Sequence, residues 1–167
     1  MPNHTMKFHP AFHPLLRDGR KTQTRRVVTC DVTREELLKA LAIENEHARH
    51  DAIYDIAWSY CPWRSGDTIT VEGTDIRLTV TAIRCERLQG ISDEDCEAEG
   101  VEYEPRYSIG GYYDAYRHPL DNGWAGADAA DAFIDMWECF YPEGPKSWAA
   151  NPTVWVVEFE RLEKEDE

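Results

Sequence analysis

Residues 18–26, DGRKTQTRR, bring together side chains that could act chemically on a polar or anionic ligand. The segment holds four of the chain's 18 lysine and arginine residues, and two threonine hydroxyls, within nine positions. A neutral lysine amine can act as a base, and a threonine hydroxyl becomes a nucleophile when a neighbouring base removes its proton. Lys21 and Thr24 are therefore candidates for catalysis.

Lys21 could serve as a base near neutral pH only if its pKa were lowered. Burial and the three arginine charges close to it in the sequence would both lower that pKa. In an extended segment, Lys21 and Thr24 would point to opposite faces. The two side chains can converge only if the chain bends between them, and the corner after Gly19 allows such a bend.

The charge of the chain is segregated. The formal net charge is -14, yet residues 17–26 contain five basic residues and a single acidic one. The remaining chain carries 13 basic and 31 acidic residues. Phosphate contacts need lysine and arginine, so this balance disfavours non-specific binding of nucleic acid over the whole surface. A small positive site on a negative body favours a small anionic or polar ligand, or one strand held at one place.

The composition indicates one globular domain, because 167 residues with 42% hydrophobic content can bury a core. No apolar run reaches membrane-spanning length, and the opening MPNHTMKFHP does not have the form of a signal peptide. The five cysteines are scattered and contain no C-x-x-C pair, and His9 and His13 have no further ligand at suitable spacing. We therefore expect a cytoplasmic protein with no membrane partner, no metal and no cofactor.

Local patterns predict most of the helices and strands. FHPLLRDG predicts a short helix that Gly19 ends, and TQTRRVVT predicts a strand after it. The other expected elements are helices from Thr33 to about His50 and over 51–58, strands over 68–72 and 76–87, a short helix from Ser92 to Gly100, a helix over 127–141 and a closing strand over 152–162. Residues 102–124 are predicted to form a long irregular loop of the kind that acts as a lid. This order favours an α+β fold, a small β-barrel decorated by helices, over a doubly wound sheet.

The pattern G-x-K-x-x-x-x-R, formed by Gly19, Lys21 and Arg26, resembles the signature of ASCH domains, which have a PUA-like β-barrel. PWRSGDTITV is similar to the turn and second strand of that family, and IRLTVTAIRCERLQGISDEDCEAEGV to its long strand and following short helix. AFIDMWECFYPEGPKSWAANPTVWVVEF resembles the ending of longer, phage-type members. The resemblance implies a single ASCH/PUA-like domain over residues 1–167, with insertions near 30–58 and 102–125.

One branch of the ASCH family consists of amidohydrolases that remove the acetyl group from N4-acetylcytidine. These enzymes use a lysine as proton acceptor, a threonine as nucleophile and a glutamate as proton donor. Four positions match their G-x-K-T-x-T segment: Gly19, Lys21, Thr22 and Thr24. The resemblance therefore implies that Lys21 is the base and Thr24 the nucleophile.

The glutamate of this branch lies in the short helix after the long strand, where Glu99 is the best match. Glu97 and Glu72 remain alternatives, because the insertions leave the alignment open. The residues expected to bind the substrate are the others of the basic segment: Gly19, Arg20, Thr22, Arg25 and Arg26.

The function that follows is an amidohydrolase that removes an acyl group from N4 of cytidine-type nucleosides. Two alternatives remain open. One is a non-catalytic ASCH module that binds RNA or a modified nucleotide, and the other is a ribonuclease that holds single-stranded RNA at the basic corner. The sequence leaves open the acyl group, the choice between nucleoside and nucleic acid, and the oligomeric state.

Overall fold

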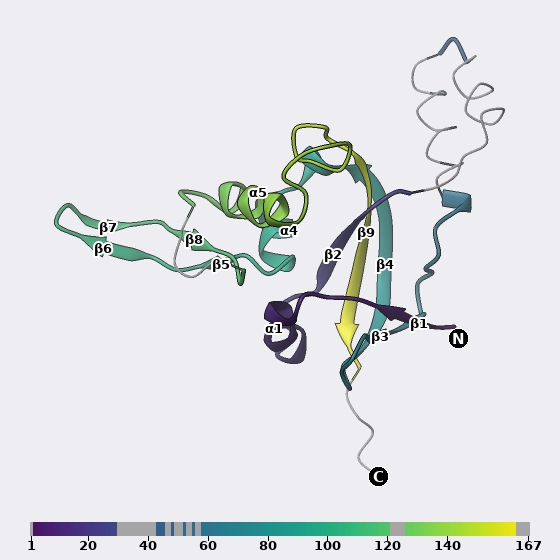
Figure 1. Cartoon of the computed structure of the whole chain (residues 1–167), viewed down its shortest axis with the longest axis horizontal. Coiled ribbons are helices and arrows are strands. Elements are labelled where there is room, and N and C mark those ends of the chain that lie inside the picture. The colour runs from purple at the N-terminus through teal and green to yellow at the C-terminus, as the bar shows by residue number, and fades with distance from the viewer. Residues whose placement is uncertain are drawn as a thin grey trace.

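The computed structural model describes residues 2–29, 43–45, 48, 52, 55, 58–120 and 126–162. Within them the chain has the expected α+β composition: one twisted sheet, helices beside it and a long hairpin that projects away from both (Figure 1). The helices expected over 33–58 lie almost wholly outside the described residues.

The main sheet has five strands in the order β1-β3-β4-β9-β2. Their bounds are β1 Asn3–Met6, β2 Gln23–Val27, β3 Thr68–Val71, β4 Arg77–Arg87 and β9 Thr153–Arg161. Strand β1 runs parallel to β3, and the other neighbours are antiparallel. The edge strands are β1 and β2, and no pairing joins them among the described strands, so the sheet is open where a closed barrel would continue.

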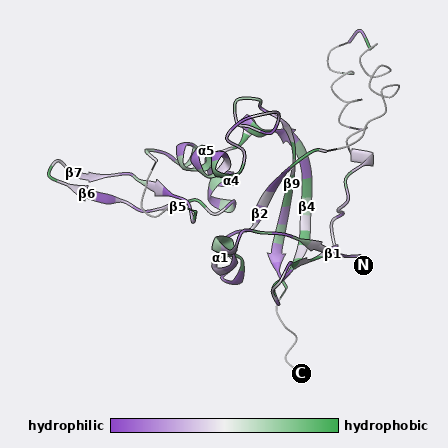
Figure 2. Cartoon of the chain, viewed as in Figure 1, coloured by the Kyte–Doolittle hydropathy of each residue, from purple (hydrophilic) through white to green (hydrophobic). Residues whose placement is uncertain are grey.

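The two longest strands, β4 and β9, form the centre of the sheet. They pair from Leu78 opposite Arg161 to Arg87 opposite Thr153, so the two strands predicted over 76–87 and 152–162 lie side by side. Residues 154–157 of β9 are all buried, because both faces of this central strand are covered. The C-terminal end of β9 turns hydrophilic, as its purple arrowhead in Figure 2 shows.

A tight corner leads from the first helices into β2. The 3-10 helix η1 Pro10–Phe12 continues into α1 His13–Arg17, and Gly19 follows with φ +71°. This left-handed conformation suits glycine and ends the helix as predicted. The carbonyl oxygen of Leu15 accepts hydrogen bonds from the backbone N of both Arg20 (2.9 Å) and Lys21 (3.1 Å). The chain therefore bends before β2 begins.

Two further helices lie beside the sheet. Helix α4 Asp93–Ala98 begins at Ser92, whose hydroxyl accepts a hydrogen bond from the backbone N of Asp95, as the sequence predicts. Helix α5 Ala129–Phe140 buries an apolar stripe that includes Phe133, Met136 and Trp137. No helix in the described part of the chain is long and apolar enough to cross a bilayer.

The prediction of an irregular loop over 102–124 is wrong for residues 102–117, which form a hairpin. It contains two short antiparallel ladders, β5 Glu102–Tyr103 with β8 Tyr116–Arg117 and β6 Arg106–Ser108 with β7 Gly111–Tyr113. Cross-strand tyrosine contacts at both ladders stabilise the hairpin. The prediction also missed β1, because its partner β3 is more than 60 residues away in the sequence and its four residues show no local strand pattern.

Candidate functional site

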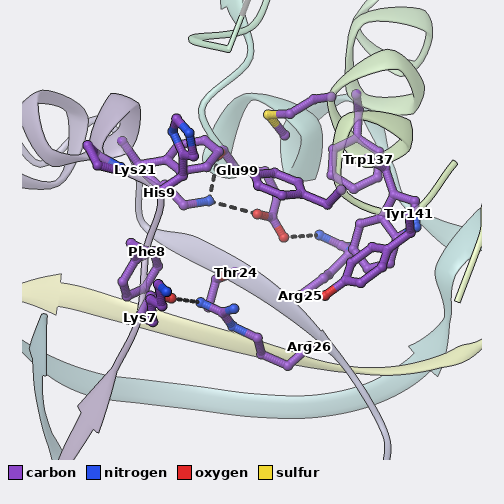
Figure 3. A pocket seen from close by; sticks show the side chains of 15 residues that line it. Lys7, Phe8, His9, Lys21, Thr24, Arg25, Arg26, Glu99, Trp137 and Tyr141 are labelled. Carbon is purple, nitrogen blue, oxygen red and sulfur yellow. Dashed lines mark hydrogen bonds and ion pairs between the residues drawn. The ribbon is translucent and has the colours of Figure 1, made fainter. Parts of the chain in front are cut away.

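The sequence-predicted residues Lys21, Thr24, Arg25, Arg26 and Glu99 line one pocket of about 320 Å³. The pocket lies between β2, the end of α4, the segment after β1, and α5 (Figure 3). Its walls are largely aromatic: Phe8, Phe12, Phe133, Trp137, Phe140 and Tyr141. Aromatic walls with a few convergent polar groups are typical of sites for small molecules.

Lys21 is buried, with 3% of its surface exposed. Its Nζ donates hydrogen bonds to the carbonyl oxygens of Gln23 (2.8 Å) and Glu99 (2.6 Å), and to Glu99 Oε2 (2.7 Å). Three acceptors match the three N–H donors of an ammonium group. Burial lowers the pKa of Lys21, and although the carboxylate of Glu99 opposes this, the pKa stays below its ordinary value of 10.5.

Glu99 lies where α4 ends. Its backbone N donates to the carbonyl oxygen of Asp95 (2.9 Å), and Gly100 follows with φ +111°. Glu99 is 4% exposed, and its carboxylate contacts two cations, with Oε2 bound to Lys21 and Oε1 accepting from Arg25 at 3.2 Å. This carboxylate therefore points directly at the predicted base.

The other two candidate acids lie elsewhere. Glu97 is exposed and lines a second cavity, which shares no lining residue with the first. Glu72 is exposed beside the end of β3, where its backbone N bonds to the carbonyl oxygen of Met6. Of the three glutamates, Glu99 is the one that lines the pocket.

Thr24 is buried in β2, opposite Val157 of β9, and it lines the pocket. Strand β2 begins at Gln23, so Lys21 belongs to the corner before the strand and escapes its strict alternation of faces. Lys21 Nζ donates to Gln23 and Glu99 rather than to Thr24. No side chain among the described residues bonds to the Thr24 hydroxyl, which leaves that hydroxyl available to a ligand.

Arg25 links the pocket residue Glu99 to polar side chains around it. Its side chain is fully buried, and it donates to Gln23, Glu99, Glu86 (2.7 Å) and Asp95 (2.8 Å). Gln23 also donates to Asp95 at 2.9 Å, which closes a ring of polar contacts. The ring fixes the orientation of the Glu99 carboxylate.

Asp95 joins this ring to β4, because Arg84 also donates to it. Burial alone would raise the pKa of the Asp95 carboxyl. Hydrogen bonds from Gln23 and Arg25, with the charges of Arg25 and Arg84, outweigh burial and hold the pKa below its usual range. Gln23, Arg84, Glu86 and Asp95 were not predicted to belong to the site, because their spacing in the sequence carries no signal of the network.

Three predicted binding residues lie outside the pocket. Gly19 ends α1, and the exposed Arg20 pairs with Asp18 and Glu102. The side chain of Thr22 is exposed, while its backbone N donates to the carbonyl oxygen of Ala98 (3.0 Å) and its carbonyl oxygen accepts from Phe159 (2.8 Å). These residues support the corner and do not line the cavity.

Among the described residues, one group has metal-ligand chemistry: His118, Asp135 and Cys139, whose ligand atoms lie within 4.8 Å of one another. His118 Nδ1 accepts a hydrogen bond from the backbone N of Leu120 (3.2 Å), so Nε2 carries the ring proton and donates to Asp135 Oδ2 at 2.7 Å. A metal at Nε2 would displace that proton and oppose the Leu120 contact. The group is explained as a buried histidine with both nitrogens satisfied.

No protein-family model matches the sequence, and no curated protein matches it. Two solved structures are similar to the chain. The crystal structure of hypothetical protein PH0355 is 15% identical, with 96% of this chain and 99% of that chain covered and a TM-score of 0.48. The solution NMR structure of protein PF0455 from Pyrococcus furiosus is 19% identical, with 97% and 99% covered and a TM-score of 0.42. Similarity at this level carries no argument about function.

Proposed function

We propose that the protein is an ASCH-type amidohydrolase that removes an acyl group from N4 of a cytidine-type nucleoside. The observation that carries this proposal is the buried contact between Lys21 Nζ and Glu99 Oε2 (2.7 Å), in a pocket that Thr24 also lines. Amide cleavage needs an activated nucleophile and an acid for the leaving nitrogen. The pocket holds one residue suited to each role.

The Lys21–Glu99 contact can supply both protonation states. Transfer of one proton from the Lys21 ammonium to the Glu99 carboxylate gives a neutral amine and a carboxylic acid. The amine then takes the Thr24 hydroxyl proton as the oxygen attacks the acyl carbon, and the Glu99 acid protonates the departing N4. This leaves an acyl ester on Thr24, a free cytosine amine and the original ion pair, and water hydrolyses the ester in a second round.

Two features of the surroundings disfavour the charged form of Lys21. Low local dielectric reduces the advantage of the ion pair over the neutral pair, and the charges of Arg25 and Arg26 further disfavour the Lys21 ammonium. Arg25 holds the second oxygen of Glu99 and so keeps its partner oxygen directed at Lys21. The aromatic walls offer stacking surfaces for a pyrimidine ring.

A PUA-like barrel is part of the same proposal. The described sheet has open edges at β1 and β2, yet these edges approach each other through side chains. Arg26 Nη2 on β2 donates to the carbonyl oxygen of Lys7, the residue after β1, at 2.7 Å. Phe8, which also follows β1, meets the ring of Phe159 on the central strand β9 edge to face, with the ring centroids 6.1 Å apart. These contacts support a sheet that curls toward closure around the pocket.

One observation favours a second function, a non-catalytic module that binds a modified nucleotide in the same pocket. All three N–H donors of a protonated Lys21 find acceptors, which stabilises the form that cannot act as a base. In that case the lysine would contribute only hydrogen bonds and charge.

Incubation with N4-acetylcytidine, followed by measurement of released cytidine, separates the two functions. We expect release by the wild-type protein, loss on the order of 10³-fold or more for Thr24→Val, and normal rates for Thr22→Val, whose side chain lies outside the pocket. Thr24→Ser keeps a hydroxyl and should retain part of the activity. Binding of the nucleoside without release of cytidine would establish the binding module instead.

A further inference from the structure

We propose that Arg26 forms an anion subsite in the pocket, so that the ligand is an acylated nucleoside carrying a negative group. That group is either a phosphate on the ribose or a carboxylate on the acyl chain. This inference rests on the proposed function for the identity of the ligand, but its physical basis is the state of the Arg26 guanidinium.

Arg26 is the pocket-lining guanidinium that lacks an acidic partner. Its Nη2 donates to the carbonyl oxygen of Lys7, and its Nε is buried without a hydrogen-bond partner. No carboxylate of the described residues forms an ion pair with it. Lys21 and Arg25, by contrast, are both bound to Glu99.

The absence of an acidic partner for the Arg26 guanidinium costs free energy of folding. Arg26 is half-buried and its Nε is fully buried, so the guanidinium loses part of its hydration and no opposite charge replaces it. Burial accordingly lowers the pKa of Arg26, and although Glu99 and Tyr141 oppose that effect, the pKa stays below its ordinary value. The Phe8 ring, 5.1 Å from the guanidinium carbon, offers partial compensation. A ligand phosphate or carboxylate would supply the missing charge through strong charge-assisted hydrogen bonds.

The position of Arg26 fits a group attached to the substrate. Thr24 and Arg26 are two residues apart in β2, so their side chains leave the same face at a spacing of about 7 Å. An anion at Arg26 would therefore lie a few bonds from a carbonyl carbon presented to Thr24. The exposed Lys7 adds a second cation at the same side of the pocket.

Two pairs of ligands distinguish the sources of the anion. The first compares the dissociation constants of cytidine and cytidine 5'-monophosphate, and the second compares kcat/KM for N4-acetylcytidine and N4-succinylcytidine. We expect the wild-type protein to favour the anionic member of at least one pair by about ten-fold or more. Arg26→Gln should remove that preference, and Arg26→Lys should keep part of it. The control Arg77→Gln, an exposed arginine on β4 away from the pocket, should preserve it.

A third measurement does not depend on amide hydrolysis. Phenyl phosphate combines an aromatic ring with an anion, and its binding can be followed by the NMR signal of the Arg26 side-chain Nε–H, assigned by comparison with Arg26→Gln. A saturable shift of that signal without hydrolysis of any acylated nucleoside would retain the subsite and refute the amidohydrolase. The absence of both the shift and an Arg26-dependent preference in either ligand pair, with normal thermal unfolding of the variants, would overturn the subsite.

Discussion

The lowered pKa of Lys21 predicts how activity should depend on pH. The pKa of Lys21 lies below 10.5 in the folded chain, so its amine becomes neutral at lower pH than in the unfolded chain. We expect kcat/KM for N4-acetylcytidine to rise with pH along a limb whose midpoint is below 10.5. Lys21→Arg should be inactive across the whole range, because a guanidinium keeps its proton.

The same pKa shift acts on stability. Between the lowered pKa and 10.5 the unfolded chain binds more protons than the folded chain, so the free energy of unfolding rises with pH in that window. Urea unfolding at several pH values should show this rise in the wild-type protein, and Lys21→Met should reduce it. An equal pH dependence in both proteins would contradict a lowered pKa at Lys21.

Replacement of the acid tests the assignment of Glu99. Glu99→Gln keeps the shape and one acceptor oxygen but removes the proton donor, and we expect a loss on the order of 10²–10⁴-fold in the rate of deacylation. Glu97→Gln is the matched control, since Glu97 lies two residues away and faces the second cavity. Similar losses in both variants would show that helix α4 and its surroundings, rather than this carboxylate, were disturbed.

At the scale of helices and strands, the sequence predicted the features that depend on interactions between neighbouring residues, such as helix ends and caps. Gly19 and Gly100 end helices through left-handed backbone conformations, and Ser92 caps α4. In β4, alternating burial holds for Leu78 and Val80 and ends at the register shift between Val80 and Ala82. The hairpin over 102–117 was missed, because its stability comes from cross-strand tyrosines and not from a strong alternating pattern.

In the site too, features that depend on neighbouring residues could be predicted, and features that depend on long-range contacts could not. Residues 18–26 could be predicted to contain catalytic and binding side chains, and the resemblance to the ASCH family placed Glu99 near them. The ring that orients Glu99 could not be predicted, because it joins residues of β2, β4 and α4, and β9 separates β2 from β4 in the sheet. Arg26 could be predicted to bind a ligand, but its lack of an acidic partner depends on the packing around it.

Gly100 links the end of α4 to the position of Glu99, and its replacement tests that link. Its φ is +111°, and an added Cβ would lie 3.0 Å from Leu15 Cδ1. We expect Gly100→Ala to lower the free energy of unfolding by about 1–3 kcal/mol and to reduce deacylation by moving Glu99. Gly90→Ala is the control, because a Cβ there meets nothing within 4 Å. Chemical unfolding of both variants measures the difference, and equal stabilities would contradict strain at Gly100.

At the scale of the molecule, the distribution of charge favours a small ligand over a polynucleotide. The formal net charge is -14, and the cations that line the pocket come from two short segments around Lys7 and residues 21–26. Arg20, the basic residue that could extend this patch beyond the pocket, is already paired with Asp18 and Glu102. A long strand leaving the pocket would therefore meet mostly acidic surface, whereas a mononucleotide would contact the positive site alone.

The salt dependence of binding measures this difference. For single-stranded nucleic acid the logarithm of the association constant falls with that of salt concentration by about 0.7 for each phosphate neutralised. A nucleoside should therefore show almost no dependence, and a ligand with one anion at Arg26 a slope of about one or less. Isothermal titration of cytidine, cytidine 5'-monophosphate and a single-stranded RNA of about ten nucleotides at several salt concentrations would compare the slopes. Tight RNA binding with a slope of several, lost in Arg26→Gln but unaffected by cytidine as competitor, would favour the RNA-binding alternative, because it would place the phosphate backbone rather than a nucleoside at the basic corner.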